Sequence, residues 1–249
     1  MPRQNVVITT EDGECAATLH TPSDQAGHPG VLMYPDAIGA RETFAGMGDQ
    51  LAGLGYTVLV PDIYYRDAPY APFDAATVFG DQEERARLGA LAGSITTERA
   101  IADAGAFLEF LAGRAEVSGS SMGTTGYCMG GKLSLLAAAH HPDRVAAAAS
   151  FHGGNLAAED DPDSPYRVAD RIRAAVLVAA AQDDRSFPPE QYDRLERALT
   201  EAGVRHTLAV YPAKHGFAVP DNDTYDTAAA QRHWAALESL YGETLLGQR

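Results

Sequence analysis

Cysteine is scarce in this sequence, since only Cys15 and Cys128 occur among its 249 residues. Two cysteines cannot form the set of disulfides that stabilises small secreted domains. No apolar run reaches the roughly 18 residues that a membrane-spanning helix needs. The first five residues also lack the apolar segment of a secretory signal peptide. These absences predict a cytoplasmic protein whose thiols are reduced.

Positive charge is also in short supply. The chain has 19 Lys and Arg against 34 Asp and Glu, which gives a formal net charge of -15. Such a surface repels phosphate backbones and anionic lipids, so we expect no nucleic-acid partner and no membrane partner. An anionic small molecule would have to meet a local patch of positive charge. The histidines and cysteines show no metal-ligand spacing, and we expect neither a metal nor a cofactor.

The length and the hydrophobic content of 45% fit one large α/β domain spanning residues 1–249, with two small domains as the weaker alternative. Short β-rich segments alternate with helical patterns, which predicts a mostly parallel, doubly wound sheet with helices on both faces. The first two segments have no helix between them, which indicates an antiparallel hairpin. Continuous apolar runs among the later segments indicate parallel strands buried on both faces. The eight expected strands are 5–9, 15–20, 31–34, 56–60, 122–127, 146–151, 175–180 and 206–211.

Residues 62–97 break this alternation. Their first part, 62–73, is rich in aromatic residues and proline and has no clear helical or strand period. A long irregular excursion in a compact domain is often functional. We therefore expect a lid or a pocket wall here, with a mobile surface loop as the alternative.

Two segments fit the sharp strand-to-helix turn that exposes a nucleophile above an α/β sheet. Residues 119–123 read GSSMG and place Ser121 in the literal G-x-S-x-G pattern, whereas residues 126–131 read GYCMGG and place Cys128 there. Ser121 follows a poor strand and precedes a poor helix start. Cys128 follows the expected strand 122–127 and precedes a strong helical pattern that stops at a proline. The context therefore favours Cys128.

A thiol nucleophile needs an imidazole within reach and a carboxylate that orients the imidazole. Asp183 and Asp184 follow the seventh expected strand, and His215 follows the eighth. Nucleophile, acid and base thus come after strands five, seven and eight, which is the chain order of an α/β-hydrolase. From spacing alone, either aspartate could be the acid.

The same fold predicts the donors that bind an oxyanion. They are the N–H of Met129, directly after the nucleophile, and an N–H of the loop after the third strand, where Ala37 is the candidate. Residues 151–154 read FHGG, which is similar to an oxyanion motif of lipases but lies in the wrong loop. We expect His152 to form part of the pocket wall.

With these motifs, the sequence resembles the dienelactone hydrolase family. The matching stretches are 61–66, 126–131, 184–188 and 215–217, which together span most of the chain. The resemblance implies an α/β-hydrolase fold, a cysteine nucleophile and a triad of Cys128, Asp184 and His215. Asp184 is preferred over Asp183 because the family has a proline four residues after the acid, and Pro188 fits.

The resemblance also implies contacts around the triad. Asp36 matches a carboxylate that interacts with the resting thiol, and Arg66 matches an arginine that grips a substrate carboxylate. A second family arginine corresponds to Val219, so Arg41 is the candidate replacement. The remaining residues expected beside the substrate are Tyr64 and Phe217.

The function predicted from these residues is hydrolysis of an activated ester or lactone through a thioester intermediate. The substrate is expected to be a small molecule. Three alternatives remain: a serine esterase that uses Ser121, a thioester or small-ester hydrolase of the same fold, and a non-catalytic ligand-binding protein.

Overall fold

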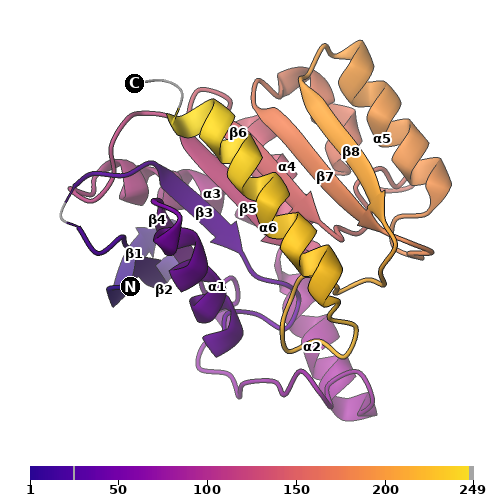
Figure 1. The fold of residues 1–249 in the computed structure, drawn as a ribbon. Coiled ribbons are helices and arrows are strands. Elements are labelled where there is room, and N and C mark those ends of the chain that lie inside the picture. Colours follow the sequence, from indigo (N-terminus) through magenta and orange to yellow (C-terminus); the bar gives the residue numbers. More distant parts are fainter. Residues whose placement is uncertain (25, 247–249) are drawn as a thin grey trace.

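An eight-stranded sheet forms the centre of the structure, a computed structural model that describes residues 1–24 and 26–246. Its strand order is β1-β2-β4-β3-β5-β6-β7-β8 (Figure 1). β1 and β2 form the expected antiparallel hairpin, β2 also pairs antiparallel with β4, and the other neighbours are parallel. All eight expected strands are therefore confirmed. Their bounds are Arg3–Thr10 (β1), Gly13–His20 (β2), Gly30–Tyr34 (β3), Thr57–Pro61 (β4), Met122–Tyr127 (β5), Val145–Phe151 (β6), Ala175–Ala181 (β7) and His206–Tyr211 (β8).

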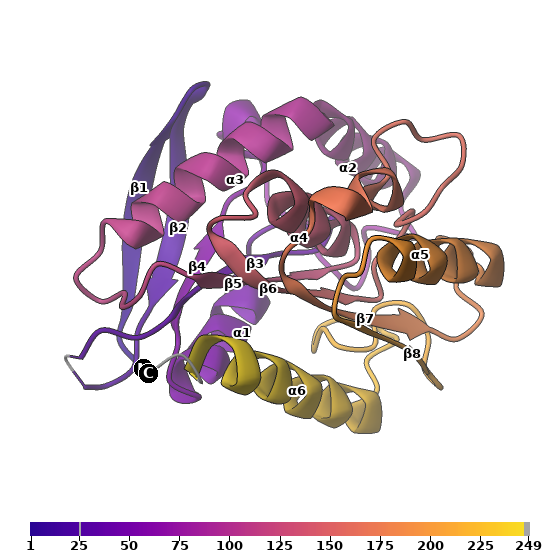
Figure 2. The same cartoon turned by 90° about the horizontal axis from the view of Figure 1, so that it is seen from above.

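Helices cover both faces of this sheet, as the sequence predicts. Figure 2 shows α1 (Glu42–Gly53) and α6 (Thr227–Tyr241) on one face, and α3 (Thr97–Ala112), α4 (Met129–His140) and α5 (Pro189–Glu201) on the other. Successive residues of a strand point to opposite faces of the sheet and pack into the two cores. Val31 and Met33 of β3 belong to the core beneath α1 and α6, whereas Leu32 and Tyr34 belong to the core beneath α3 and α4. No helix in residues 1–24 and 26–246 is long and apolar enough to cross a membrane.

The excursion 62–97 is more regular than the sequence predicts. It contains a short 3-10 helix, Tyr65–Asp67, and a full helix, α2 (Gln82–Ser94). Asp81 caps α2, because its Oδ1 accepts hydrogen bonds from the N–H groups of Glu83 and Glu84 at 2.8 and 3.0 Å. Only two side chains of α2 are buried, so the helix carries no clear apolar stripe. Because an apolar stripe is the main sequence signal of a helix, its absence explains why the sequence predicted no helix here.

The start of α4 packs directly against the ends of β5 and β3. A Cβ atom at Gly126 would lie 1.9 Å from the carbonyl oxygen of Gly130, and one at Gly130 would lie 2.3 Å from the carbonyl oxygen of Pro35. Both neighbours are backbone atoms, which cannot move aside without shifting the strand or the helix. Only glycine at these two positions allows the chain to turn this sharply from β5 into α4.

We therefore predict that Gly130→Ala destabilises the protein by at least about 2 kcal/mol through overpacking. Gly46→Ala in α1 is the matched control, because a Cβ there has no neighbour within 4 Å. The control should be more stable than the parent by about 1 kcal/mol, since alanine favours the helix. Urea denaturation of the two variants measures both effects. Equal stabilities would contradict the proposed close contact.

Candidate active site

Cys128 occupies the turn between β5 and α4 in a conformation that few non-glycine residues adopt. Its φ and ψ are 53° and -119°. The neighbouring backbone holds it there, because its N–H donates to the carbonyl of Phe151 at 3.1 Å and its carbonyl accepts from Gly131 at 3.0 Å. Such local strain persists only when the surrounding structure enforces it. The turn presents the partly exposed thiol of Cys128 at the carboxyl edge of the sheet.

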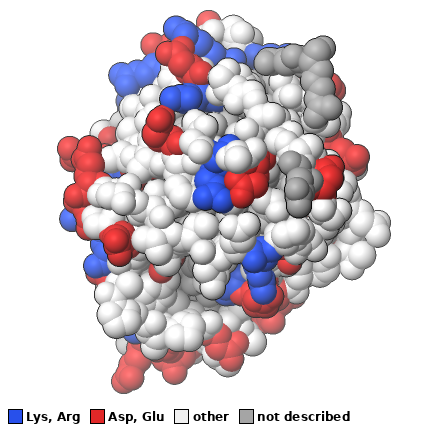
Figure 3. All heavy atoms as spheres, turned by 90° about the vertical axis from the view of Figure 1, so that its left-hand side faces the viewer, with Lys and Arg blue, Asp and Glu red and all other residues white. Residues whose placement is uncertain are grey.

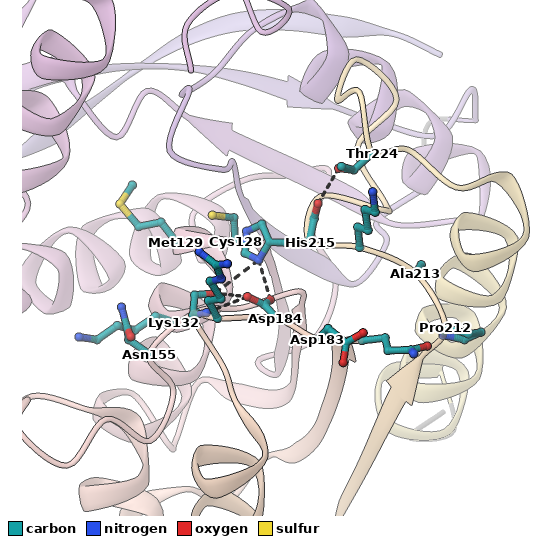
Figure 4. Close-up of a pocket in the computed structure, with 15 residues that line it drawn as sticks. Cys128, Met129, Lys132, Asn155, Asp183, Asp184, Pro212, Ala213, His215 and Thr224 are labelled. Atoms are coloured by element: carbon teal, nitrogen blue, oxygen red, sulfur yellow. Dashed lines mark hydrogen bonds and ion pairs between the residues drawn. The ribbon is translucent and has the colours of Figure 1, made fainter. Parts of the chain in front are cut away.

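His215 and Asp184 meet Cys128 at this edge. His215 follows β8 and Asp184 follows β7, and Nδ1 of His215 lies 2.7 Å from Oδ2 of Asp184. Figure 4 shows the imidazole between the thiol and the carboxylate. Parallel strands end at the same edge of a sheet, so Cys128 and His215 converge there although they are 87 positions apart along the chain.

The environment of His215 favours the charged imidazolium. Burial lowers the pKa of His215, but its interactions with Asp184 and Cys128 outweigh this effect and raise the pKa to about 10. Burial raises the pKa of Asp184, and its hydrogen bonds to His215 and Ser186 more than compensate, so that its pKa lies below the ordinary value. Both shifts favour an ion pair between the Asp184 carboxylate and the protonated imidazole of His215.

The structure distinguishes the two aspartates that spacing left open. Asp184 is 9% exposed and bonded to the imidazole. Asp183 is exposed and lines the cavity without a hydrogen bond to His215 in the described part of the chain. Only Asp184 is placed to orient the ring.

Ser186 is a site residue that the sequence analysis missed. Its hydroxyl donates to Oδ1 of Asp184 at 2.7 Å, and its N–H donates to the same oxygen at 2.9 Å. These bonds fix the carboxylate so that Oδ2 faces His215. The signal was present in the sequence, because a serine two residues after an aspartate is typical of a turn closed on the carboxylate.

Ala37 and Met129, the two expected oxyanion donors, each border a cavity that Cys128 also borders. Ala37 belongs to the loop after β3, and Met129 is the first residue of α4. Within residues 1–24 and 26–246, neither N–H has a hydrogen-bond acceptor. The loop is fixed from behind, since the hydroxyl of the buried Tyr64 donates to the carbonyl of Ala37 at 2.6 Å. Tyr64 therefore supports the loop and does not line the cavities around Cys128.

Two cavities open on either side of Cys128. The larger, of about 870 Å³, extends past Asp184 and Met129, and the smaller, of about 410 Å³, extends past Ala37 and Phe79. Both are bounded by Cys128, His215 and Thr224. Their volumes fall in the range of small-molecule sites.

His152 and Phe217 form the floor behind the imidazole. Their ring centroids are 5.0 Å apart, and the ring of His152 is 5.1 Å from that of His215. His152 borders the smaller cavity, as expected for a pocket wall, but it is completely buried. Burial holds the pKa of His152 well below its ordinary value, so the ring is neutral. Phe217 is also buried and packs behind the site without lining either cavity.

Arg66 does not reach the site, which corrects the expectation that it grips a substrate. Its guanidinium donates to both oxygens of Asp103 at 2.7 and 2.9 Å and to Asp12 at 2.6 Å. Asp103 is only 7% exposed and needs a nearby cation. Arg66 neutralises this carboxylate and borders neither cavity around Cys128.

Arg41 and Asp36 pair with each other. Asp36 borders the smaller cavity, but its oxygens accept from Arg41 at 2.7 and 3.0 Å and from the N–H of Ile38 at 3.0 Å. Arg41 also binds Asp221 and lines neither cavity around Cys128. Its charge is occupied by protein carboxylates, so the expectation that Arg41 binds substrate is not met.

Ser121 lies at the opposite end of β5. A strand rises about 3.3 Å per residue, which separates Ser121 from Cys128 by roughly 20 Å. The surface hollow beside Ser121 contains no histidine among its lining residues, such as Arg144 and Thr244. Ser121 has no base to activate it there.

The larger cavity gathers positive charge that the sequence analysis overlooked. The chain has only two lysines, Lys132 and Lys214, and both line this cavity together with Arg185. Lys132 pairs with Asp161 at 2.5 Å, whereas Lys214 and Arg185 have no ion pair to a described carboxylate. On the face at the N-terminal strands, basic groups are instead interspersed with acidic ones (Figure 3). No three His, Cys, Asp or Glu in the described ranges are grouped to hold a metal ion.

Comparison with known proteins gives consistent matches. Residues 15–245 match the model of the dienelactone hydrolase family. A protein of Methylorubrum extorquens with the name "putative carboxymethylenebutenolidase" is 28% identical over 240 residues, covering 95% of this chain and 79% of that protein. The carboxymethylenebutenolidase of Rhodococcus opacus is 28% identical over 222 residues, covering 87% and 81%. The crystal structure of a dienelactone hydrolase-like promiscuous phosphotriesterase from metagenomic libraries is 25% identical, with a TM-score of 0.75 over 98% of this chain and 99% of that one.

The hydrogen bond from His215 to Asp184 generates a prediction for pH. Asp184→Asn removes the negative charge beside the imidazole, so the pKa of His215 should fall from about 10 by at least one unit. The raised pKa of His215 stabilises the folded state fully at a pH below the pKa of histidine in the unfolded chain, and this contribution is lost as the pH rises towards 10. The difference in the free energy of unfolding between the parent and the variant should therefore shrink as the pH rises from 6 to 10. NMR titration of the imidazole and thermal unfolding from pH 6 to 10 measure the two effects.

Asp183→Asn is the matched control, because Asp183 is exposed and does not contact the ring. The control should leave the His215 titration unchanged. A shift of equal size in both variants would mean that general surface charge, and not the hydrogen bond, sets the pKa.

Proposed function

The chain belongs to the dienelactone hydrolase family and is a hydrolase of ester or lactone bonds, and we propose that it works through Cys128, His215 and Asp184. One observation carries this proposal. A thiol on a strained turn borders two cavities together with an imidazole, and Nδ1 of that imidazole is 2.7 Å from a buried carboxylate. This is the arrangement of nucleophile, base and orienting acid that covalent acyl transfer requires.

The first step is attack of the Cys128 thiolate on the ester carbonyl carbon. A carbon–sulfur bond forms, and the electrons of the C=O bond move to the oxygen. The N–H groups of Ala37 and Met129 donate to this oxyanion, and the N-terminus of α4 adds favourable dipole charge. Donors of this kind are each worth roughly 3 kcal/mol of barrier in related enzymes.

Collapse of this intermediate breaks the carbon–oxygen bond to the leaving group. The imidazolium of His215 gives its proton to the departing oxygen, which leaves as an alcohol or enol. In a lactone this group stays attached through the ring. The products of this step are a thioester on Cys128 and a neutral His215.

Water then hydrolyses the thioester. Neutral His215 takes a proton from the water, and the hydroxide adds to the carbonyl carbon. Loss of the thiolate restores Cys128 beside the imidazolium and releases a carboxylic acid, so one ester and one water give one acid and one alcohol. Throughout, Asp184 keeps Nδ1 of His215 protonated and stabilises its charge.

The charge around the larger cavity supports a substrate with an acidic group. Lys214 and Arg185 lie within the same cavity as Cys128. In a protein of net charge -15, this is the local positive patch that an anion needs. We propose that these two residues attract the acidic end of a small ester or lactone, in place of Arg66.

The excursion 62–97 fits the role of a pocket wall. Ala75 and Phe79 border the smaller cavity together with His215, and Phe79 is 54% exposed. We propose that this segment covers one substituent of the substrate and that residues 1–249 form one domain around the sheet.

We predict that Cys128→Ala lowers kcat for p-nitrophenyl ester hydrolysis by at least about 10³-fold, because no thioester forms. Mass spectrometry of acid-quenched enzyme should find an acyl group on Cys128 of the parent and none on the variant. Ser121→Ala and Cys15→Ser are the controls and should keep the parent rate. Burial raises the pKa of Cys15 to about 12, so that thiol is inert. Full activity of Cys128→Ala would refute the mechanism.

Substrate charge provides a second prediction. Lys214→Gln and Arg185→Gln should each raise KM about two- to fivefold for an ester that carries a carboxylate, since exposed charges contribute up to about 1 kcal/mol. KM for the neutral ester of the same shape should stay unchanged. Arg197→Gln, an exposed arginine of α5 outside the cavity, should affect neither ester. A similar change for both esters would remove the proposed role in anion binding.

A further inference from the structure

Arg41 links two loops that carry different parts of the proposed catalytic machinery. Its guanidinium donates to both oxygens of Asp36, in the loop after β3, at 2.7 and 3.0 Å. It also donates to both oxygens of Asp221, in the loop between β8 and α6, at 2.7 and 2.8 Å. The fifth N–H donates to the carbonyl of Gly39 at 3.1 Å. All five guanidinium protons therefore have an acceptor.

On one side, this network fixes the peptide of Ala37. Asp36 and Ile38 flank Ala37, and the Asp36 carboxylate that binds Arg41 also accepts from the N–H of Ile38 at 3.0 Å. A second bond joins the N–H of Gly39 to the carbonyl of Asp36 at 3.0 Å. Arg41 fixes the carboxylate of Asp36, and this carboxylate fixes the N–H of Ile38. The backbone on both sides of Ala37 is therefore held, and with it the direction of the Ala37 N–H.

On the other side, the network holds the loop of His215. The hydroxyl of Thr43 donates to Asp221 at 2.6 Å, beside the bonds from Arg41. Within the loop, the N–H of Asn222 donates to the carbonyl of Val219 at 3.1 Å, and the hydroxyl of Thr224 donates to the carbonyl of His215 at 2.5 Å. These bonds connect the anchored Asp221 to the backbone that carries the imidazole.

Both loops line the smaller cavity. Asp36 and Ala37 of the first loop border it, as do His215, Asn222 and Thr224 of the second. Arg41 itself lies outside this cavity, and its side chain is only 14% exposed. A planar guanidinium that binds two carboxylates in this way fixes their relative position, which a lysine ammonium cannot do.

We propose that Arg41 is a positioning residue that sets the distance between the oxyanion donor of Ala37 and the imidazole of His215. It touches no substrate and acts through its bonds to Asp36, Gly39 and Asp221. The kinetic part of this inference rests on the proposed function, whereas the coupling between the loops does not.

The test compares Arg41→Ala and Arg41→Lys with Arg66→Ala. Arg66 is the matched control, because it also joins two carboxylates, Asp12 and Asp103, and its side chain is 12% exposed, but it lies outside the cavities around Cys128. With a neutral p-nitrophenyl ester, both Arg41 variants should lose roughly 10- to 100-fold in kcat with KM within twofold, since small errors in position cost this much. Arg66→Ala should keep the parent kcat at temperatures where it is folded.

Chemical rescue separates geometry from charge and from stability. Ethylguanidinium added to Arg41→Ala should restore part of kcat, whereas ethylammonium at the same ionic strength should not. Recovery with ethylammonium, or full activity of Arg41→Lys, would overturn the proposal because charge alone would suffice. A KM increase confined to carboxylate-bearing esters would overturn it in favour of substrate binding by Arg41.

Hydrogen–deuterium exchange tests the coupling without any activity measurement. In Arg41→Ala, the amides of 36–40 and of 216–224 should exchange faster together, and ethylguanidinium should slow both. Arg66→Ala should leave both segments at the parent rate. Faster exchange in only one loop would overturn the coupling. An inactive parent enzyme with coupled exchange would instead refute the proposed function and retain the link through Arg41.

Discussion

The close contact between the start of α4 and the ends of β5 and β3 is the constraint on which the site depends. Without side chains at Gly126 and Gly130, the helix begins directly against the strands, and the chain between them has to pass through the strained conformation of Cys128. This turn lifts the thiol above the sheet edge. The loops after β3, β7 and β8 then need only ordinary lengths to bring Ala37, Asp184 and His215 to it.

The strands and the meeting of Cys128, Asp184 and His215 could be predicted from the sequence, because both depend on local or topological patterns. Continuous apolar runs such as 175–180 are typical of buried parallel strands. Cys128, Asp184 and His215 follow the fifth, seventh and eighth strands in an order that the fold restricts, so their meeting could be expected before any coordinates were known. The choice between Asp183 and Asp184 required either the family resemblance or the observed burial.

Features that depend on long-range partners were beyond the sequence. The expected role of Arg66 was wrong because nothing local shows that Asp103, 37 residues away, needs its charge. Helix α2 was missed because it buries only two side chains. The positive charge of the larger cavity was missed because Lys132 and Lys214 are far apart in the chain and come together only through the sheet. The number of Lys and Arg residues does not show which of them could bind an anionic substrate, because this depends on which are paired with carboxylates in the folded protein.

The position of the thiol between two cavities has a consequence for the order of events in a turnover. Because Cys128 lines both cavities, the acyl group and the leaving group on the attacked carbon each have a cavity available to them. Departure of the first product then empties one side of the sulfur while the acyl group still fills the other. His215 lines both cavities, so water in the vacated one can reach the imidazole while the acyl group stays in the other.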